Sequence, residues 1–431
     1  MIRILSLCLL ATGLFSCLED ECEEVRYYTA YQPVVIAASE WRNNNFSLAG
    51  PESVCEPAGF YVYGDLLFVL DRQKGLHIID NGDNDNPTPL AFLEIPGGSG
   101  LAVRNGMLYV SQYIDLLTFD LRDPAKPALV SRTENVFDLN SDFSTNMMSN
   151  GDVVIDMELG TEQIEIDCGK RSESEPYFWY ESTLYAVDRV QAFRAVADAN
   201  FATPTREVVG VGGSLARFTI NQGTLYVVDD HSLRTFSLAE PAAPAFVGKT
   251  SLGWGIETIF PYEDMLFIGA QQGMHIYGLD DPNQPTFLST FQHVRSCDPV
   301  VVQNDIAYVT MWGGSSCGDA TDRLMVVDVT DARAPRLLQD FPMQNSHGLG
   351  VDADHLFLCN GEDGLRVFDL EENGQLADEV HHLPGFSAKD VIVLPTRREL
   401  IALGWEQAGI TQFDYDANGL PRPVSEIAVC P

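Results

Sequence analysis

The chain has 431 residues, of which 26 are Lys or Arg and 62 are Asp or Glu, so its formal net charge is −36. Such an acidic chain lacks the basic surface that neutralises phosphates, which argues against nucleic acid as a partner and against docking on anionic lipid. Because 45% of the residues are hydrophobic and only 20% are charged, the chain can bury a large core and is not a disordered polyelectrolyte.

The first residues have the features of an export signal. Arg3 precedes an apolar run over residues 4–14, which is too short to span a bilayer and is typical of a secretory signal peptide, here residues 1–16. The run ends in the sequence LFSC, which resembles a bacterial lipobox with Cys17 as the lipidated residue. We therefore expect a lipid anchor at Cys17. An ordinary signal peptide followed by an incidental cysteine is the alternative.

An acidic segment follows Cys17. Five of the seven residues 18–24 are Asp or Glu, and we expect residues 17–30 to form a solvated tether. The same segment resembles the export signal of surface lipoproteins of Bacteroidota. The expected location is therefore the outer membrane, with the lipoprotein exposed at the cell surface. The periplasmic face is the alternative.

Two short apolar segments recur in a fixed order eight times along the rest of the chain. Residues 66–70 are the first copy of one segment, and residues 75–80 are the first copy of the other. The second segment ends, in successive units, at Asp80, Asp120, Asp167, Ser237, Gly278, Asp328, Asp369 and Asp414. In six units a proline follows seven residues later, namely Pro87, Pro127, Pro244, Pro285, Pro335 and Pro421. A proline at the start of a strand costs no ladder hydrogen bond, so each of these prolines indicates the start of a further strand.

A unit of about 40 residues with four short strands has the size of one β-propeller blade. The sequence therefore predicts an all-β fold, a single β-propeller over residues 31–431 with four-stranded blades. Eight units are counted, but the third, near residues 152–167, departs from the pattern, so seven or eight blades remain open. Residues 31–38 have the pattern of an extra strand, which we expect to close the ring by pairing near residues 424–429.

The repeat also resembles a known family. The second segment and the Asp-Pro-x-x-Pro turn after it, as in residues 123–127 and 281–285, are similar to the LVIVD repeat of bacterial and archaeal surface proteins. The resemblance covers roughly residues 58–427. It implies a propeller, and it implies no catalytic residues, because that family has no settled activity.

The cysteines fit an exported protein, in which disulfides can form. Beyond Cys8 and Cys17 they are Cys22, Cys55, Cys168, Cys297, Cys317, Cys359 and Cys430. Their spacing matches no zinc site, so we expect no metal and no cofactor. The repeat register places Cys297 at the start of an innermost strand and Cys317 after its hairpin partner, which predicts a disulfide between these two. The pairing of the other five is left open.

Residues 168–204 interrupt the third unit without any strand-like alternation. They form either a docking loop or lid on one face, or an exposed decoration.

One candidate site follows from the repeat register. Most copies of the first apolar segment contain one aromatic residue at a fixed place. Glu257, Asp298 and His347 lie ten residues before this aromatic in consecutive units, and Asp390 occupies the equivalent place in the last unit. These positions start the innermost strands, so we expect them to ring one mouth of the channel, with Trp254 and Arg295 beside it. They form either a ligand site or a solvated acidic rim.

Motifs of enzymatic propellers are absent from the sequence. The function predicted is therefore that of a non-enzymatic, lipid-anchored cell-envelope β-propeller that binds a protein or glycan partner. One alternative is a carboxylate-dependent hydrolase or lyase at the channel mouth, acting on an extracellular polymer. Another is an architectural subunit of an envelope complex.

Overall fold

The computed structural model describes residues 23–43, 46, 48–72, 74–139, 146–167, 209–293, 299–313, 321–405 and 409–430. The chain divides into two compact units, residues 1–43 with 146–187 and residues 44–145 with 188–431. The expected signal peptide, the lipidated Cys17, the Cys297–Cys317 disulfide and the insertion at 168–204 lie outside the described residues. Within the described ranges, no helix is long and apolar enough to cross a membrane.

The second unit is built of short strands. The strands of its first three sheets are β2 (Leu48–Ala49), β3 (Pro57–Tyr63), β4 (Leu66–Asp71), β5 (Gly75–Asp80), β6 (Thr88–Glu94), β7 (Leu101–Arg104), β8 (Met107–Gln112), β9 (Asp115–Asp120), β10 (Ala128–Thr133), β12 (Val211–Gly212), β13 (Phe218–Asn221), β14 (Thr224–Val228), β15 (Ser232–Ser237) and β16 (Ala245–Ser251). Those of the other four sheets are β17 (Ile256–Tyr262), β18 (Met265–Ala270), β19 (Gly273–Gly278), β20 (Thr286–Gln292), β21 (Val300–Gln303), β22 (Ile306–Met311), β23 (Arg323–Asp328), β24 (Arg336–Pro342), β25 (Leu349–Val351), β26 (His355–Cys359), β27 (Leu365–Leu370), β28 (Leu376–Leu383), β29 (Ala388–Leu394), β30 (Glu399–Gly404), β31 (Ile410–Tyr415) and β32 (Pro421–Ile427).

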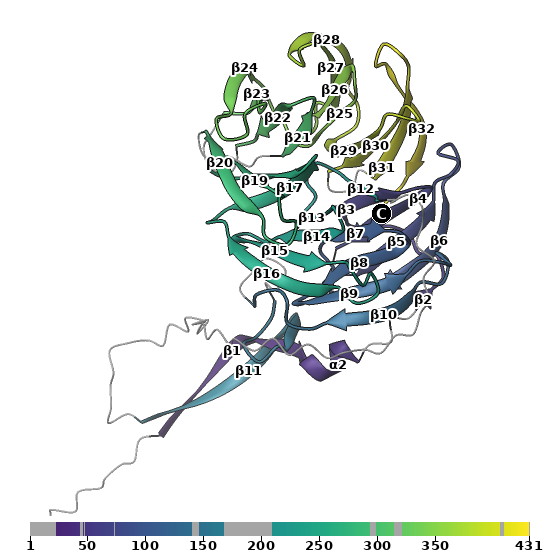
Figure 1. Cartoon of the computed structure of the whole chain (residues 1–431). Coiled ribbons are helices and arrows are strands. Elements are labelled where there is room, and N and C mark those ends of the chain that lie inside the picture. Colours follow the sequence, from purple (N-terminus) through teal and green to yellow (C-terminus); the bar gives the residue numbers. More distant parts are fainter. Residues whose placement is uncertain are drawn as a thin grey trace, which may run out of the picture. The chain divides into compact units, whose positions relative to one another are not determined.

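These strands form antiparallel meanders of four consecutive strands each. Among the described residues of this unit, six sheets have four strands, and a seventh, β3 to β6, is widened by β12 on one edge and β2 on the other. Figure 1 shows β3, β7, β13, β17, β21, β25 and β29 toward the centre of this unit, with the fourth strand of each sheet at the outside. The architecture is consistent with a β-propeller, as the repeat predicted.

Burial follows from this arrangement. Every residue of β8, the second strand of its sheet, is buried, because neighbouring sheets cover both of its faces. The outermost strand β16 instead alternates between exposed and half-buried residues.

Tyrosines in the second strands of two sheets also form hydrogen bonds to the neighbouring blade. The hydroxyl of Tyr109 donates to the carbonyl of Pro241 (3.0 Å), and that of Tyr226 donates to the carbonyl of Pro282 (2.7 Å). Both prolines follow an acidic residue in the turn between the third and fourth strands of the next blade. The repeated aromatic and the repeated turn thus form one contact between blades.

The last and first sheets meet along a polar seam. Asn81 and Gln412 exchange two side-chain hydrogen bonds, of 2.8 and 2.7 Å, and both are buried. At one end of this seam Val54 bridges Val429 in parallel.

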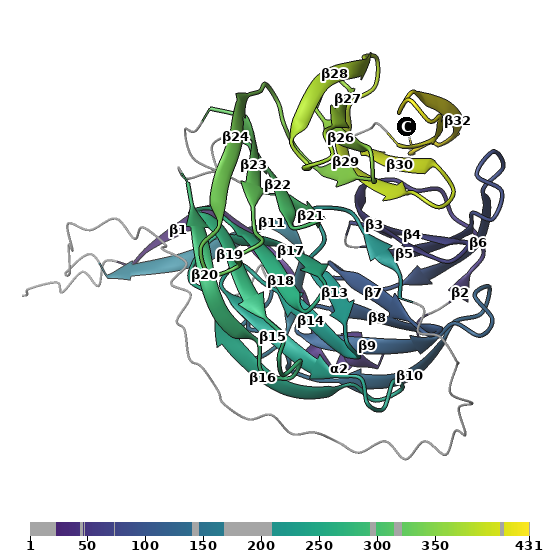
Figure 2. The ribbon, with the colours of Figure 1, turned by 45° about the horizontal axis from the view of Figure 1, so that its top comes forward.

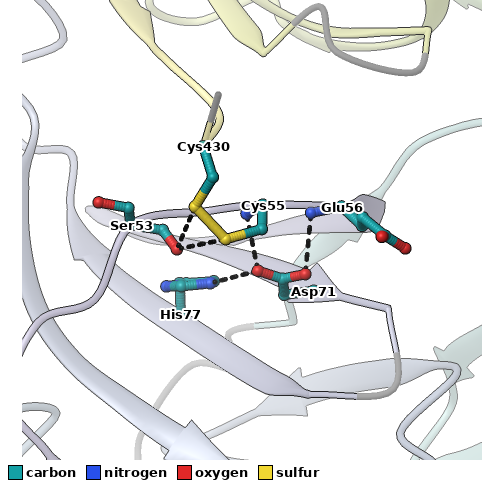
Figure 3. The surroundings of a disulfide bond; sticks show 6 residues. All are labelled: Ser53, Cys55, Glu56, Asp71, His77 and Cys430. Atoms are coloured by element: carbon teal, nitrogen blue, oxygen red, sulfur yellow. Dashed lines mark hydrogen bonds and ion pairs between the residues drawn. A yellow bond between two sulfur atoms is a disulfide. The ribbon is translucent and has the colours of Figure 1, made fainter.

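A disulfide joins Cys55 to Cys430 beside that bridge, across 375 residues of sequence. Figure 3 shows the Asp71 carboxylate below the bond, where it accepts hydrogen bonds from the backbone N–H groups of Cys55 (2.8 Å) and Glu56 (2.9 Å). The sequence left this pairing open. Cys359, also left open, is a buried free thiol.

The first unit is a two-stranded sheet of β1 (Glu23–Ile36) and β11 (Val153–Asp167), followed after β1 by the short helix α2 (Ala38–Arg42). The prediction that residues 31–38 pair with the last strand is wrong, because Tyr31–Ile36 pair with residues 153–159. The third repeat unit adds no four-stranded sheet, since its two segments belong to the single strand β11. β11 is one residue longer than β1 and pairs with it along its whole run, which a last strand as short as β32 could not do.

Candidate functional site

Three tryptophans mark one end of the sheets in the second unit. Trp254 comes just before the innermost strand β17, whereas Trp312 and Trp405 come directly after the second strands β22 and β30. In an antiparallel meander the start of the first strand and the end of the second strand lie at the same end. We call this end, with these three residues, the tryptophan face. Trp254 is 80% exposed, and its ring centroid lies 5.9 Å from that of His231.

The other two tryptophans enclose His347, which the sequence had singled out. The centroid of its imidazole lies 4.7 Å from that of Trp312 and 4.9 Å from that of Trp405, edge to face in both cases. The Nζ of Lys389 lies 5.2 Å from the Trp405 centroid, within range of a cation–π interaction. Three adjacent blades thus supply an aromatic cluster.

Backbone contacts fix the position of His347. Its carbonyl accepts a hydrogen bond from the Thr310 hydroxyl (2.6 Å), and its N–H donates to the carbonyl of Cys359 (2.8 Å). The N–H of the next residue, Gly348, donates to the carbonyl of Lys389 (2.9 Å). The start of β25 is therefore held between the sheets on either side of it.

Burial lowers the pKa values of the two titratable groups in this cluster, His347 and Lys389. His347 is only 8% exposed, and burial lowers the pKa of its imidazole to about 4, with Lys389 acting in the same direction and Asp322 opposing it. Burial also lowers the pKa of Lys389, which the Asp390 carboxylate partly offsets. At neutral pH His347 is neutral, so it presents an aromatic and hydrogen-bonding surface and not a positive charge.

Asp390 lies beneath this cluster and is enclosed. One carboxylate oxygen accepts hydrogen bonds from the Ser214 hydroxyl (2.8 Å), the Ser214 N–H (3.1 Å) and the Val391 N–H (3.0 Å), and the other accepts from the Leu215 N–H (3.2 Å). Burial raises its pKa to about 6, although these hydrogen bonds and Lys389 favour the ionised form. A Cβ atom at Gly213 would lie 2.1 Å from the carboxylate, so only glycine fits there.

Ser214 extends this network to a third blade. Its hydroxyl oxygen accepts a hydrogen bond from the N–H of Leu349 (2.9 Å) while its proton goes to Asp390. The segment before β13 thereby ties the starts of β25 and β29 together. A small cavity of about 50 Å³ beside Asp390 and Leu215 is too small for anything beyond water.

The strand register shows which side chains are equivalent in different blades. A β-bulge lies between Ile256 and Thr258 in β17, and the same bulge lies between Ala388 and Asp390 in β29. The residue equivalent to Glu257 is therefore Lys389 and not Asp390. Because a shift of one residue reverses the direction of a strand side chain, Lys389 reaches the aromatic cluster while Asp390 points into the interior.

The structure thus brings together two of the six residues that the sequence nominated, His347 and Asp390, through their neighbours Gly348 and Lys389. Glu257 is half-buried and acts on another group, since its charge counters the lowering of the Arg217 pKa by burial. Asp298 and Arg295 lie outside the described residues.

Sequence reasoning missed Trp312, Trp405 and Lys389. A signal for the two tryptophans existed, because both follow the second strand of a repeat unit directly.

A group of possible metal ligands lies beside Trp254 and includes its neighbour His231. Each of three residues offers one ligand atom, and these atoms all lie within 4.8 Å of one another; the residues are Asp138, Asp229 and His231. However, Arg234 pairs with both carboxylates and Lys249 pairs with Asp138, so two cations already neutralise them. This cluster is an ion-pair network, with the Arg234 side chain only 1% exposed.

No protein-family model and no protein of curated function matches this sequence, so membership of the LVIVD repeat family stays a prediction. Solved structures do share the fold. A putative 6-phosphogluconolactonase from Bacteroides uniformis is 12% identical, with a TM-score of 0.54 over 83% of this chain and 93% of that one. The periplasmic gluconolactonase PpgL from Pseudomonas aeruginosa is also 12% identical, with a TM-score of 0.54 over 86% and 96%. A functionally unknown protein from Desulfotomaculum acetoxidans is 10% identical, with a TM-score of 0.50 over 85% and 97%. The chain is therefore similar to β-propeller proteins, and at these identities the similarity concerns the fold alone.

Proposed function

We propose that this protein is a non-enzymatic β-propeller of the cell envelope that binds a partner through the tryptophan face. The observation that carries the proposal is the exposure of Trp254, at 80%, on the same face as the Trp312–Trp405 cluster. Tryptophan is enriched at the energetic centres of interfaces, where a partner removes its large apolar surface from water. A protein fits this face best, because its tryptophans belong to several blades and span a broad surface.

The proposal includes seven blades, with the ring closed where the Cys55–Cys430 disulfide joins the last sheet to the first. It also includes a signal peptide at residues 1–16, a lipid on Cys17 and a tether that ends where β1 begins, at Glu23, and not at residue 30. The lipobox-like sequence supports the anchor. One structural neighbour, PpgL, is a periplasmic protein, which agrees with an envelope location. Of the region 31–431 that the sequence assigned to the propeller, residues 31–43 and 146–167 belong to the first unit, and residues 168–204 would be an insertion between β11 and β12.

The test compares variants of the full lipoprotein in crosslinking capture from solubilised membranes. Trp254→Ala should lose the partner that the parent retains, while both melt at the same temperature, because Trp254 contributes little buried surface. Phe287→Ala is the matched control, since Phe287 is an exposed aromatic (52%) on the outer strand β20. A partner that survives Trp254→Ala contradicts the proposal. Binding to isolated surface glycans, with no protein captured, would identify a glycan as the partner.

A second candidate function is hydrolysis at the channel mouth. The observation in its favour is the Asp390 carboxyl, whose pKa of about 6 suits a general acid or base, near Lys389 and His347. Two of the structural neighbours are named as lactonases, which suggests a sugar lactone as the first substrate to assay. Turnover that Asp390→Asn abolishes would establish this function. The enclosed position of the carboxylate argues against it.

A further inference from the structure

A cleft whose lining includes no residue of the aromatic cluster lies between the fourth and fifth blades. Its volume is about 420 Å³, which falls in the range of small-molecule sites and far above that of a packing defect. It opens between the end of β20 on one side and strands β22, β23 and β24 on the other, whose positions can be followed in Figure 2. The lining residues are Phe291, Gln292, His293, Met311, Thr321, Arg323, Met325, Leu337 and Asp340.

The inner wall of the cleft is apolar. Met311 and Met325 are 2% and 4% exposed and belong to the hydrophobic core between the two blades, against which Phe291 packs. Leu337, at the outer side, is 48% exposed. Methionine side chains are flexible and polarisable, so they adapt to apolar ligands of different shape. This wall fits an alkyl chain or an aromatic ring.

One ion pair supplies the polar side. The Nε of Arg323 donates to the Asp340 carboxylate at 2.5 Å, and the two side chains are 33% and 32% exposed. Among the described residues, Asp340 is the only side-chain partner of Arg323. The terminal nitrogens of the guanidinium therefore retain N–H groups that can donate to a ligand. A guanidinium matches the two oxygens of a carboxylate in a paired geometry.

We propose that this cleft binds a small amphipathic carboxylate, whose apolar part lies on Met311, Met325 and Phe291 and whose carboxylate pairs with Arg323. A monoanion fits better than a phosphate, because Asp340 beside the guanidinium repels a second negative charge. The net charge of −36 also disfavours a ligand that carries two negative charges. The cleft lies at the same end of the sheets as the tryptophan face, since Met311 directly precedes Trp312, but its lining includes none of the three tryptophans.

The experiment titrates octanoate into full-length protein that carries ¹³C-methyl methionine, with 1-octanol and inorganic phosphate as comparison probes. The protein has ten methionines, and single Met→Leu variants assign the signals of Met311 and Met325. We expect octanoate to shift these two signals, and 1-octanol to bind at least tenfold more weakly.

Two variants test the role of the guanidinium. Arg323→Gln should weaken octanoate binding at least tenfold. Arg336→Gln should leave it unchanged, because Arg336 is 74% exposed and pairs with Asp328, which does not line the cleft. Leu337→Trp, at a partly exposed position where folding should tolerate the change, should fill the cleft and abolish the shifts.

Three results would overturn the proposal. The first is no shift of Met311 or Met325 with octanoate up to about 10 mM, where even weak binding would register. The second is equal binding of 1-octanol, which would remove the role of the carboxylate. The third is equal weakening by Arg323→Gln and Arg336→Gln, which would show an effect of overall charge.

Discussion

The Cys55–Cys430 disulfide allows a direct measurement of how firmly the first and last sheets of the second unit are joined. The bond spans 375 residues, and the loop-closure relation gives the chain entropy removed from the unfolded state as about 6 kcal/mol at 25 °C for a loop of that length. Measured stabilisation by disulfides is smaller, at most about 5 kcal/mol, because residual structure and native strain reduce it. We therefore expect the Cys55→Ser/Cys430→Ser variant to lose about 3–5 kcal/mol in free energy of unfolding.

The assay is urea denaturation monitored by tryptophan fluorescence. The midpoint should fall in the double variant while the denaturant slope stays similar, since the folded surface is unchanged. Each single variant breaks the same bond, so each should match the double variant and not half of it. Variants are preferable to a reductant, which would act on the remaining cysteines as well.

A loss below about 0.5 kcal/mol in all three variants would refute this reasoning, because the predicted entropy term would then be absent. The contact between the first and last sheets would in that case depend on noncovalent interactions such as the hydrogen bonds of Asn81 and Gln412.

Three further predictions concern hydrogen bonds and titrating groups. Tyr226→Phe removes one hydrogen bond between blades and should cost about 1 kcal/mol in urea denaturation, whereas an unchanged midpoint would mean the bond contributes nothing. Asn81→Ala or Gln412→Ala leaves the other amide buried without its partner, so each should cost about 1–3 kcal/mol, and additive losses would show that the pair is uncoupled. Between pH 4 and 6 the raised pKa of Asp390 makes stability fall as pH rises, and the lowered pKa of His347 makes it rise, so the two effects oppose each other. Thermal midpoints of Asp390→Asn should therefore rise with pH over this range and those of His347→Gln should fall, and parallel profiles would contradict the assignment.

The sequence predicted the fold well because each blade buries the same pattern of residues. The two apolar segments and the proline seven residues later recur because every blade packs in the same way, so a search for periodicity finds them. Strand β11 was misinterpreted for the same reason. Its alternating residues resemble those of a blade strand, and only its partner β1 shows that it belongs to a separate sheet.

The site was harder to predict because it depends on register and on contacts between distant blades. Counting from the repeat aromatic placed His347 at the start of an innermost strand, and the structure has it just before β25. The last unit has no such aromatic, and there the count fell on Asp390, one residue beyond Lys389, which is the equivalent of Glu257. The pairing of Cys55 with Cys430 could not be inferred from spacing, since only the contact between the first and last sheets brings residues 375 apart in sequence together. Local patterns contain no information about such a contact.

The same disulfide changes what a cut in the chain would do. Cys55 precedes the first blade and Cys430 follows the last, so the backbone between them and the bond form a covalent circle. A circle must be opened twice before it separates into two pieces. One proteolytic nick in any turn between these cysteines, such as that at residues 123–127, therefore leaves a single molecule whose new ends are still held by the packing of the blades around them.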